Sequence, residues 1–470
     1  MKKNLLFSLL GLALYTTVFA QSSGPGSRSR EDAIRGLMDT ADVPGLCVGM
    51  VQNGSIKYVK AFGYRNAALH QLNDTATCFY AASLAKSLFA YLVMQLVQEK
   101  VIDLDKPLYT YLPKPLPDYE NYKDLAGDDR WKLITARHCL DHTTGFPNWR
   151  QFNPHGNNKL EIFFRPGEHF AYSGEGISLL QLVVETVTKK GLEELAQERI
   201  FKPFGMRRTS YVWQPAFESD YAVGHDKNGD TIPKVRNRTA YAAGSMETTV
   251  ADFSRFMQAV LLSRRLDPAF RRQMLTPQVQ VGGWKEASIF DSSIAVQSKE
   301  MHVAYGLGWG LFASSRGPAF FKEGHLDGWE HYVIAWPEEK SALIILCNSS
   351  NGESMFKELV EKLGRTTLPW KWEGYWPYGP NAKLPESVLK PITGEYDGKL
   401  KAIVTLEDGR LKVTSPTVNL SKTNLYAIDA SHFYLKIMDT RIEFVKDPDG
   451  KIIKAILDDE GEHYELKKVR

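Results

Sequence analysis

The spacing of apolar residues predicts two antiparallel hairpins, one near each end of the first 350 residues. Leu46–Val51 and Ile56–Phe62 are short runs of β-forming residues joined through Asn53-Gly54, a strong signal for a tight hairpin turn. The runs 332–336 and 342–347 are separated by a short segment that contains the turn-forming residues 337–340, which predicts a second hairpin. These segments indicate strands that pair with their neighbours in the chain.

Between the hairpins the apolar period changes from that of strands to that of helices. Helical spacing occurs over Glu31–Thr40, from Leu84 to Val97 with an end before Asp103, and over Ile177–Val187. Strands early, helices in the middle and strands late predict an α+β fold, an α/β sandwich. Its antiparallel sheet is formed by the N- and C-terminal parts of the chain, with a helical lobe inserted between them.

The first twenty residues have the pattern of a signal peptide. Lys2 and Lys3 precede an apolar run over Leu5–Val18, which is followed by a small-residue cleavage site at Ala20. The run is shorter than the roughly 20 residues that a membrane span needs. We expect cleavage after Ala20, a periplasmic or secreted protein, and no stable membrane insertion afterwards.

The C-terminal part of the sequence has a different character. Residues 364–390 are rich in proline and aromatic residues and predict a linker. After it, residues 391–470 contain short β-forming runs punctuated by Asp408-Gly409 and Asp449-Gly450, which predict a small all-β, barrel-like domain.

Composition excludes several classes of protein. The chain has 58 basic and 55 acidic residues, a net charge of +3, which is too balanced for a nucleic-acid partner. Four cysteines are too few for a disulfide scaffold, and none forms a CxxC pair. Cys47 and Cys347 lie in apolar runs, so we expect buried free thiols. We find no credible set of metal ligands and expect no cofactor.

Ser83 and Lys86 are the residues most suggestive of catalysis. They lie at the start of the apolar helix and are three positions apart, so the ammonium can reach the hydroxyl. A serine hydroxyl becomes a nucleophile when a base removes its proton, and burial lowers the pKa of lysine towards that role. By itself S-x-x-K is a weak signal, and further motifs must support it.

These residues lie in a segment, Phe79–Ser87, that resembles the nucleophile segment of the serine β-lactamase and penicillin-binding-protein superfamily, especially its class C and esterase-like branch. The resemblance covers residues 31–363, with further matching motifs in the same order at Thr135–Pro147, Phe164–Gly167, Phe170–Ser173, Pro203–Met206, Ala242–Ser245 and Tyr305–Trp309. It implies a hydrolase domain over these residues. It also explains His138 and His142 as part of a loop behind the site, not as metal ligands, and likens the C-terminal domain to the lipocalin-like domains appended to this branch.

The resemblance assigns roles to two residues after the nucleophile. Tyr172 takes the place of the tyrosine in the family's Y-x-N motif, which acts with the lysine as general base and later as proton donor. Gly174 stands where many relatives have an asparagine that supports binding of the substrate's amide. Its presence places recognition of β-lactams and peptides in doubt.

The resemblance also places Gly324–Trp329 at the family's K-T-G or H-x-G position on the strand beside the cleft. His325 then matches the first residue of that motif, and Asp327, two positions later on a strand, faces the same side. An acidic Asp327 in the cleft repels substrate carboxylates. The expected oxyanion donors are the backbone N–H groups of Ser83 and Gly328.

The sequence thus predicts a metal-free, exported serine hydrolase that forms an acyl-enzyme on Ser83. Its expected partner is a small-molecule ester, amide or peptide, and an esterase, a D-aminopeptidase or carboxypeptidase, and a β-lactamase-like enzyme remain open. The alternative is a sensor or scaffold protein that binds penicillin or peptide and acylates slowly or not at all. The oligomeric state is not predicted.

Overall fold

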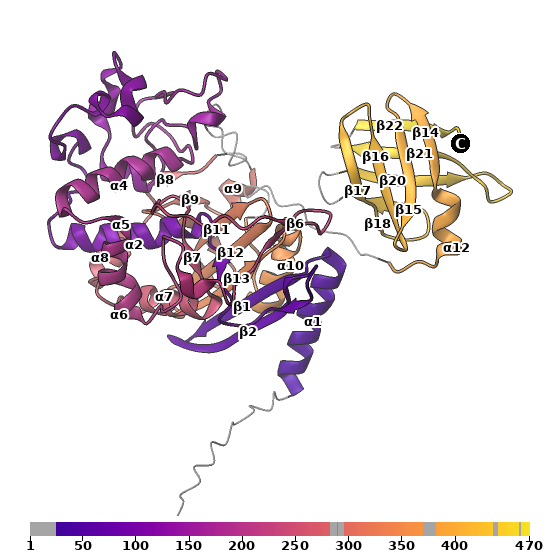
Figure 1. Ribbon diagram of the computed structural model, residues 1–470, viewed down its shortest axis with the longest axis horizontal. Helices are drawn as coiled ribbons and strands as arrows, with labels where there is room; N and C mark the ends of the chain where they lie inside the picture. Colours follow the sequence, from indigo (N-terminus) through magenta and orange to yellow (C-terminus); the bar gives the residue numbers. More distant parts are fainter. Residues whose placement is uncertain (1–24, 283–288, 290–295, 370–381, 436–439, 460–461) are drawn as a thin grey trace, which may run out of the picture.

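A nine-stranded antiparallel sheet organises the larger part of the protein (Figure 1). The computed structural model describes residues 25–282, 289, 296–369, 382–435, 440–459 and 462–470. The order of the strands is β3-β2-β1-β13-β12-β11-β10-β9-β8, so the first and last segments of this part share one sheet as predicted. The strands are β1 Gly45–Gln52, β2 Ser55–Asn66, β3 Gln71–Leu72, β8 Val279–Gln280, β9 Ala304–Tyr305, β10 Gly310–Ser314, β11 Gly317–Leu326, β12 Trp329–Trp336 and β13 Ser341–Cys347.

Both predicted hairpins are present. Between β1 and β2, Asn53 and Gly54 have φ angles of 50° and 72°. Positive φ at both central residues is the geometry that matches the right-handed twist of paired strands, and asparagine and glycine adopt it readily. The second hairpin consists of β12 and β13, which pair from Glu330↔Cys347 to Trp336↔Ser341.

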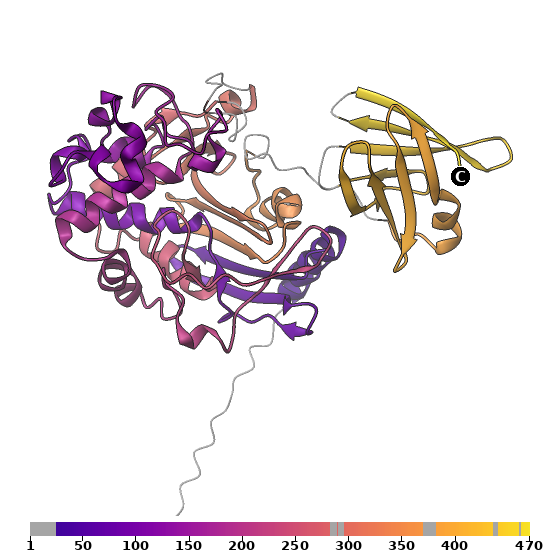
Figure 2. The same ribbon diagram turned by 45° about the horizontal axis from the view of Figure 1, so that its top comes forward.

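Helices cover both faces of the sheet and give each face its own core. One face packs against the inserted lobe, whose helices include α2 Leu84–Gln98, α4 Gly174–Thr188 and α7 Val250–Leu261. The other face is covered by α1 Pro25–Ala41 and α10 Phe356–Leu359. Figures 1 and 2 show the lobe, in purple and magenta, on the side of the sheet away from the C-terminal domain. The mixed fold with an inserted helical lobe is thereby confirmed.

Shorter elements complete the lobe and its border. The lobe also contains α3 Ala136–Leu140, α5 Leu192–Ala196, α6 Lys202–Phe204 and α8 Pro268–Met274, and a short helix α9 Val296–Glu300 precedes β9. Two small strand pairs border the lobe, namely β4 Phe79–Tyr80 with β7 Glu247–Thr248 and β5 Gly224–His225 with β6 Thr231–Ile232.

All four cysteines are buried and free. Cys47 and Cys347 lie on neighbouring strands, but Cys47 belongs to the core under the helical lobe and Cys347 to the core under α1 and α10. Because they face opposite sides of the sheet, they cannot form a disulfide. The prediction of buried thiols is confirmed, and burial raises the pKa of Cys47 well above its ordinary value.

The C-terminal part is a second nine-stranded sheet that closes almost into a barrel, as predicted. Helix α12 Glu386–Leu389 precedes it, and Arg410 forms an ion pair with Asp42 at the end of α1 at 2.6 Å. The aromatic residues of the predicted linker at 370–378 lie outside the described residues. The strands are β14 Gly394–Gly398, β15 Ala402–Glu407, β16 Arg410–Ser415, β17 Leu420–Asn424, β18 Tyr426–Ala427, β19 His432–Tyr434, β20 Thr440–Lys446, β21 Ile452–Asp459 and β22 Glu462–Lys468.

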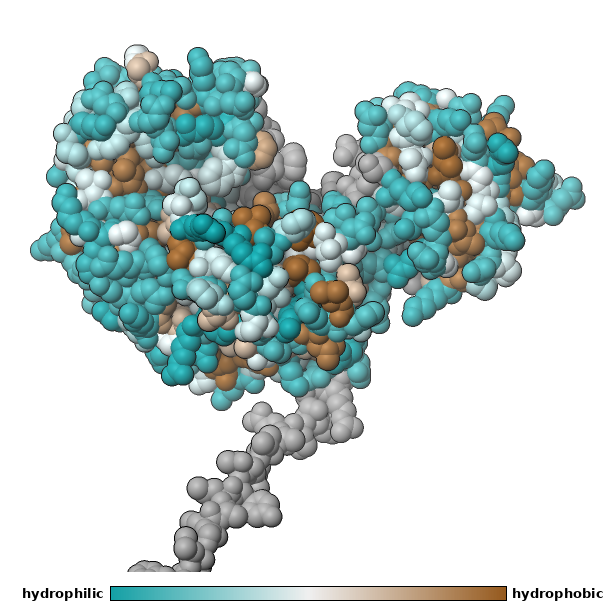
Figure 3. Space-filling view, viewed as in Figure 1, coloured by the Kyte–Doolittle hydropathy of each residue, from teal (hydrophilic) through white to brown (hydrophobic). Residues whose placement is uncertain are grey.

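Polar residues dominate the face of the molecule shown in Figure 3, where apolar residues form only small, separate patches. Among the helices that the structure describes, none has the length and apolar character needed to cross a membrane. The predicted signal peptide, residues 1–20, lies outside the described residues.

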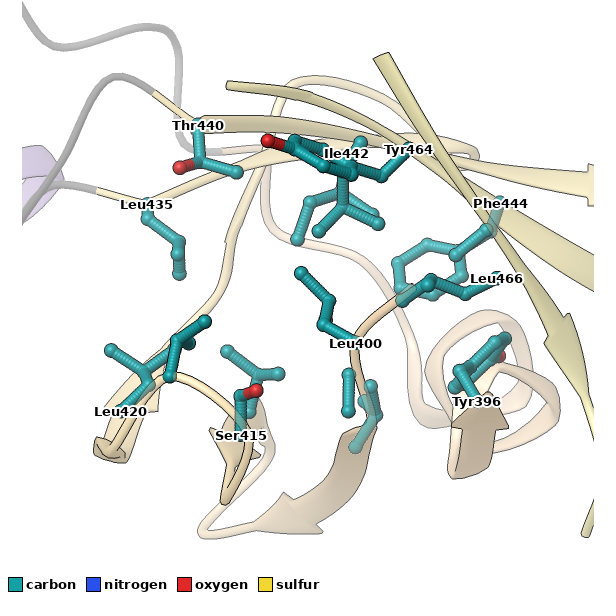
Figure 4. Close-up of a pocket in the computed structure, with 16 residues that line it drawn as sticks. Tyr396, Leu400, Ser415, Leu420, Leu435, Thr440, Ile442, Phe444, Tyr464 and Leu466 are labelled. Carbon is teal, nitrogen blue, oxygen red and sulfur yellow. The ribbon is translucent and has the colours of Figure 1, made fainter. Parts of the chain in front are cut away.

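The barrel encloses a cavity of about 150 Å³ (Figure 4). Leu400, Ile442 and Phe444 are among the apolar side chains that line it. Two lining hydroxyls are bonded to backbone carbonyls, since Tyr396 donates to Ile392 and Ser415 donates to Lys401. The interior of the second domain is therefore largely apolar.

Candidate active site

Ser83 is the N-cap residue of α2 and is separated from β4 by Ala81 and Ala82. The preceding residue, Ala82, has a φ of 46°, a left-handed conformation that costs energy for any residue with a side chain. Such strain is found at functional sites, where the surrounding structure holds it in place. Ser83 is partly exposed, whereas α2 is buried from Leu84 to Leu96. The turn therefore presents the hydroxyl of Ser83 at the edge of a buried helix.

Lys86 contacts Ser83 directly. Its Nζ lies 2.9 Å from Ser83 Oγ and donates a second hydrogen bond to the carbonyl of Ala243 at 2.6 Å. Only 1% of Lys86 is exposed. Burial lowers the pKa of Lys86; the phenol of Tyr172 opposes this effect, and the nearby cation of Lys322 adds to it. The geometry suits a lysine that takes a proton from the serine.

Tyr172 lies beside both groups. Lys86 Nζ is 5.2 Å from the centre of the Tyr172 ring, and Tyr172 Oη accepts a hydrogen bond of 3.1 Å from Lys322. The structure thus brings together three of the residues that the sequence singled out, Ser83, Lys86 and Tyr172. It adds Lys322, which the sequence interpretation missed.

Lys322 lies on β11 and is completely buried. It also donates to the carboxylate of Glu323 at 2.9 Å. Burial opposes the charge of Lys322, but Glu323 and the phenols of Tyr172 and Tyr305 outweigh burial and hold its pKa well above the ordinary value. Lys322 therefore stays charged next to the Tyr172 hydroxyl and favours the phenolate form of that residue.

His142 supports Tyr172 from behind. The two ring centres are 4.4 Å apart, and Nδ1 of His142 accepts a hydrogen bond from the backbone N–H of Ser173 at 3.2 Å. Burial and the cations of Lys322 and Lys86 lower the pKa of His142 far below its ordinary value, so the ring is neutral. Its contacts are those of a residue that positions Tyr172.

The structure corrects the predicted place of His325. Side chains alternate between the faces of a strand, and on β11 the Cβ position of Gly324 faces Ala81 and Leu84 beside the nucleophile. His325 lies on the other face, where its Nδ1 is 2.6 Å from Glu330. The position beside Tyr172 belongs to Lys322, so Lys322-Glu323-Gly324 is the segment that corresponds to K-T-G.

Asp327 and Gly328 are corrected as well. Strand β11 ends at Leu326, and Asp327 is exposed in the turn before β12, so it does not share a strand face with His325. The N–H of Gly328 donates to Ser350 Oγ at 2.7 Å, and its Cα packs against Gly224. This N–H therefore already has an acceptor within the protein, which disfavours Gly328 as an oxyanion donor.

One group in the described part of the chain has the composition of a metal site. His325, Glu330 and Glu353 have one ligand atom each within 4.8 Å of one another. They lie on the face of the sheet away from Ser83, where His325 Nδ1 is 2.6 Å from a carboxylate oxygen of Glu330. The group is therefore separate from the serine, lysine and tyrosine described above.

We expect Lys322 and His325, the two candidate site residues of β11, to differ sharply on substitution. Lys322→Met should lower kcat/KM by about 10²-fold, because it removes the charge that stabilises the Tyr172 phenolate. The matched His325→Ala variant should change kcat/KM little. The double variant Lys322→Met/Glu323→Gln avoids leaving a buried carboxylate without its cation and should show the same loss as Lys322→Met. Equal losses in the Lys322 and His325 variants would contradict this assignment.

Comparison with known proteins identifies the family. A family model described as Beta-lactamase matches residues 30–363. The model covers more than half of the chain, so the protein belongs to this family, within the superfamily of serine β-lactamases and penicillin-binding proteins.

Individual relatives are distant. The chain is 23% identical over 337 residues to "Protein flp" of Staphylococcus aureus strain MRSA252. The aligned region covers 68% of this chain and 62% of that protein. It therefore spans only about three fifths of that relative's length. It is 21% identical over 438 residues to "Penicillin-binding protein 4*" of Bacillus subtilis strain 168, covering 85% of this chain and 89% of that protein.

Solved structures share the fold. The octameric penicillin-binding protein homologue from Pyrococcus abyssi has a TM-score of 0.58 and 22% identity, covering 94% of this chain and 99% of that one. The D-alanine carboxypeptidase AmpC from Burkholderia cenocepacia has a TM-score of 0.56 and 20% identity, covering 72% of this chain and 98% of that one.

Proposed function

We propose that the protein is an exported serine hydrolase that forms an acyl-enzyme on Ser83 and cleaves an ester or amide. The observation that carries this proposal is the 2.9 Å contact between Lys86 Nζ and Ser83 Oγ, with the Tyr172 hydroxyl held by Lys322 on the same side. Family membership supports the reaction class.

The reaction begins when Ser83 Oγ attacks the substrate's carbonyl carbon and forms a new C–O bond. The proton of Ser83 passes to neutral Lys86, directly or through Tyr172. When the tetrahedral intermediate collapses, the bond to the alcohol or amine breaks, and Tyr172 relays the proton from Lys86 to that leaving group, which leaves Lys86 neutral again. Water then cleaves the acyl-serine ester, releases the acid and restores the Ser83 hydroxyl.

The negative oxygen of the intermediate requires backbone donors. The N–H of Ser83 is one candidate, because it lies at the N-terminus of α2, where developing negative charge is favoured. The other candidate donor is a backbone N–H group on the edge of β11. The pairing of β11 with β10 extends only to Phe321, whereas Lys322 to Leu326 pair with β12. We assign the second donor to this edge in place of Gly328.

The substrate class remains at the level of ester or amide. The names of the relatives, a penicillin-binding protein and a D-alanine carboxypeptidase, support acyl transfer from a cyclic or linear amide. They also support the second candidate, a protein that binds penicillin or peptide and acylates without efficient turnover. Gly174 argues against amide recognition of the usual kind.

Export and domain organisation complete the proposal. We propose that residues 1–20 are a signal peptide cleaved after Ala20 and that the protein acts in the periplasm or outside the cell. We also propose a hydrolase domain over 31–363, a linker over 364–390 and a separate barrel domain over 391–470.

Intact-mass measurement tests the reaction class. The full mature chain is incubated separately with penicillin, a p-nitrophenyl ester and a D-amino-acid amide, and adduct and product are followed with time. A hydrolase releases many equivalents of product for at least one substrate, with a transient acyl adduct. A stoichiometric adduct without further product would establish the binding protein instead, and no adduct or product with any substrate would refute both.

A further inference from the structure

Hydrogen bonds and an ion pair hold the loop at Asn148–Arg150 against the N-terminus of α4. The carbonyl of Asn148 accepts hydrogen bonds from the N–H groups of Gly174 and Glu175 at 3.0 and 3.1 Å. Arg150 donates to both carboxylate oxygens of Glu175, at 2.9 and 3.0 Å. Glu175 is only 6% exposed, whereas the Arg150 side chain is 30% exposed, so this ion pair is partly buried. The loop therefore holds the residue between these anchors, Trp149, in a fixed place.

The ring of Trp149 fills the space in front of Gly174. A Cβ atom at position 174 would lie 2.7 Å from both Cζ2 and Cη2 of that ring, closer than real Cβ atoms approach other atoms. Gly174 does not have a positive φ, so glycine is not required there by the backbone. Any larger residue at position 174 would have to displace the Trp149 ring.

The same ring lies beside the nucleophile. The centre of the Trp149 ring is 5.8 Å from Lys86 Nζ, the atom that is hydrogen-bonded to Ser83. Trp149 is partly exposed and partly packed against the core of the helical lobe. An apolar surface therefore borders the reacting serine on the side where a polar side chain at position 174 would project.

Lys322 is poorly placed to bind a substrate carboxylate. Lys322 is the buried cation on β11, and its ammonium is bonded to the Glu323 carboxylate. An ion pair of this kind has little net charge to offer an anionic substrate.

We propose that Trp149 is the specificity-determining wall of the acyl-binding subsite, and that the subsite accepts an uncharged acyl group bearing an aromatic ring or a similar bulky apolar substituent. This inference rests on the proposed function, because it describes the substrate of the Ser83 site. Ring-to-ring contact and the removal of apolar surface from water supply the preference.

The test compares two p-nitrophenyl esters that share a leaving group and differ in the acyl part, phenylacetate and acetate. The measured quantity is the ratio of their kcat/KM values. Trp149→Ala should lower this ratio by about tenfold, mainly through KM for phenylacetate, whereas Trp149→Phe should retain most of it. The Trp213→Ala variant, which removes another partly buried tryptophan that packs on Phe217 and Tyr221, controls for general loss of packing.

A double-mutant cycle tests the pairing with Gly174. Gly174→Asn alone should displace the indole ring and lower the ratio. In Trp149→Ala/Gly174→Asn the asparagine has room, so its additional effect should be much smaller than in the parent. An unchanged ratio in Trp149→Ala, or additive effects in the cycle, would overturn the inference.

Failure of this inference is distinguishable from failure of the proposed function. If the proposed function holds, the parent protein forms an acetyl adduct that is absent from Ser83→Ala, whatever the acyl preference. If the adduct forms normally but Trp149→Ala leaves the ratio of kcat/KM values unchanged, only the proposed acyl subsite is refuted. The absence of any Ser83-dependent adduct would refute the hydrolase itself.

Discussion

Replacing Ser83 by alanine should abolish covalent labelling and lower turnover by about 10⁴-fold or more, since removal of a catalytic nucleophile leaves only the contribution of binding and oxyanion stabilisation. The substitution removes one hydroxyl from a partly exposed position and leaves the buried face of α2 intact. The measurement is hydrolysis of a p-nitrophenyl ester under single-turnover and steady-state conditions, with intact mass recorded in parallel.

Ser87 provides the matched control for that experiment. It lies one turn later on the same helix, is buried, and donates its hydroxyl to the carbonyl of Leu84 at 2.7 Å. Ser87→Ala removes the same atom from the same helix and should retain both the adduct and turnover. Near-normal hydrolysis by Ser83→Ala would refute the assignment of the nucleophile.

Replacing Lys86 by methionine should lower kcat/KM by about 10³-fold, the usual range for loss of a general base. Because burial lowers the pKa of Lys86, the neutral, basic form becomes populated at a lower pH than for a free lysine. Activity of the parent should therefore rise with pH as Lys86 loses its proton, and the methionine variant should lack this rise.

Lys86→Arg separates the base from the positive charge. Arginine keeps a cation at this position but does not lose its proton in the working range of pH. We expect a loss comparable to that of Lys86→Met and the same missing rise with pH. Substantial activity in the arginine variant would mean that Lys86 acts through its charge and not as a base.

The sequence was most informative where the deciding interactions are local. The Asn53-Gly54 turn, the helix after Ser83 and the i, i+3 relation of Ser83 to Lys86 all depend on residues close together in the chain. The division into a shared sheet with an inserted lobe followed from the order of these local elements. The structure confirms that fold and brings Ser83, Lys86 and Tyr172 together.

The predicted K-T-G or H-x-G position on β11 was wrong because successive side chains of a strand point to opposite faces of the sheet. The motif was matched at His325, three residues after Lys322, so the predicted residues fell on the wrong face of the sheet and in the following turn. A Lys-x-Gly pattern was present at Lys322-Glu323-Gly324, and it was the available signal. Nothing in the sequence required β11 to bring Lys322 to Tyr172, since the two are 150 positions apart.

Trp149 was missed for a related reason. The sequence showed that Gly174 stands in the place of an asparagine, but not what occupies the vacated space. That answer depends on a loop 25 residues earlier, which the ion pair between Arg150 and Glu175 holds over the helix. Contacts of this kind become visible only in three dimensions.

Locating the acyl adduct by peptide mapping tests most directly whether the acyl-enzyme forms on Ser83. The parent protein is mixed with a p-nitrophenyl ester, quenched in acid during turnover, digested and analysed by tandem mass spectrometry. The expected result is one acyl group, attached to Ser83, that disappears when the substrate is exhausted. Steady turnover with the acyl group on another residue would contradict it.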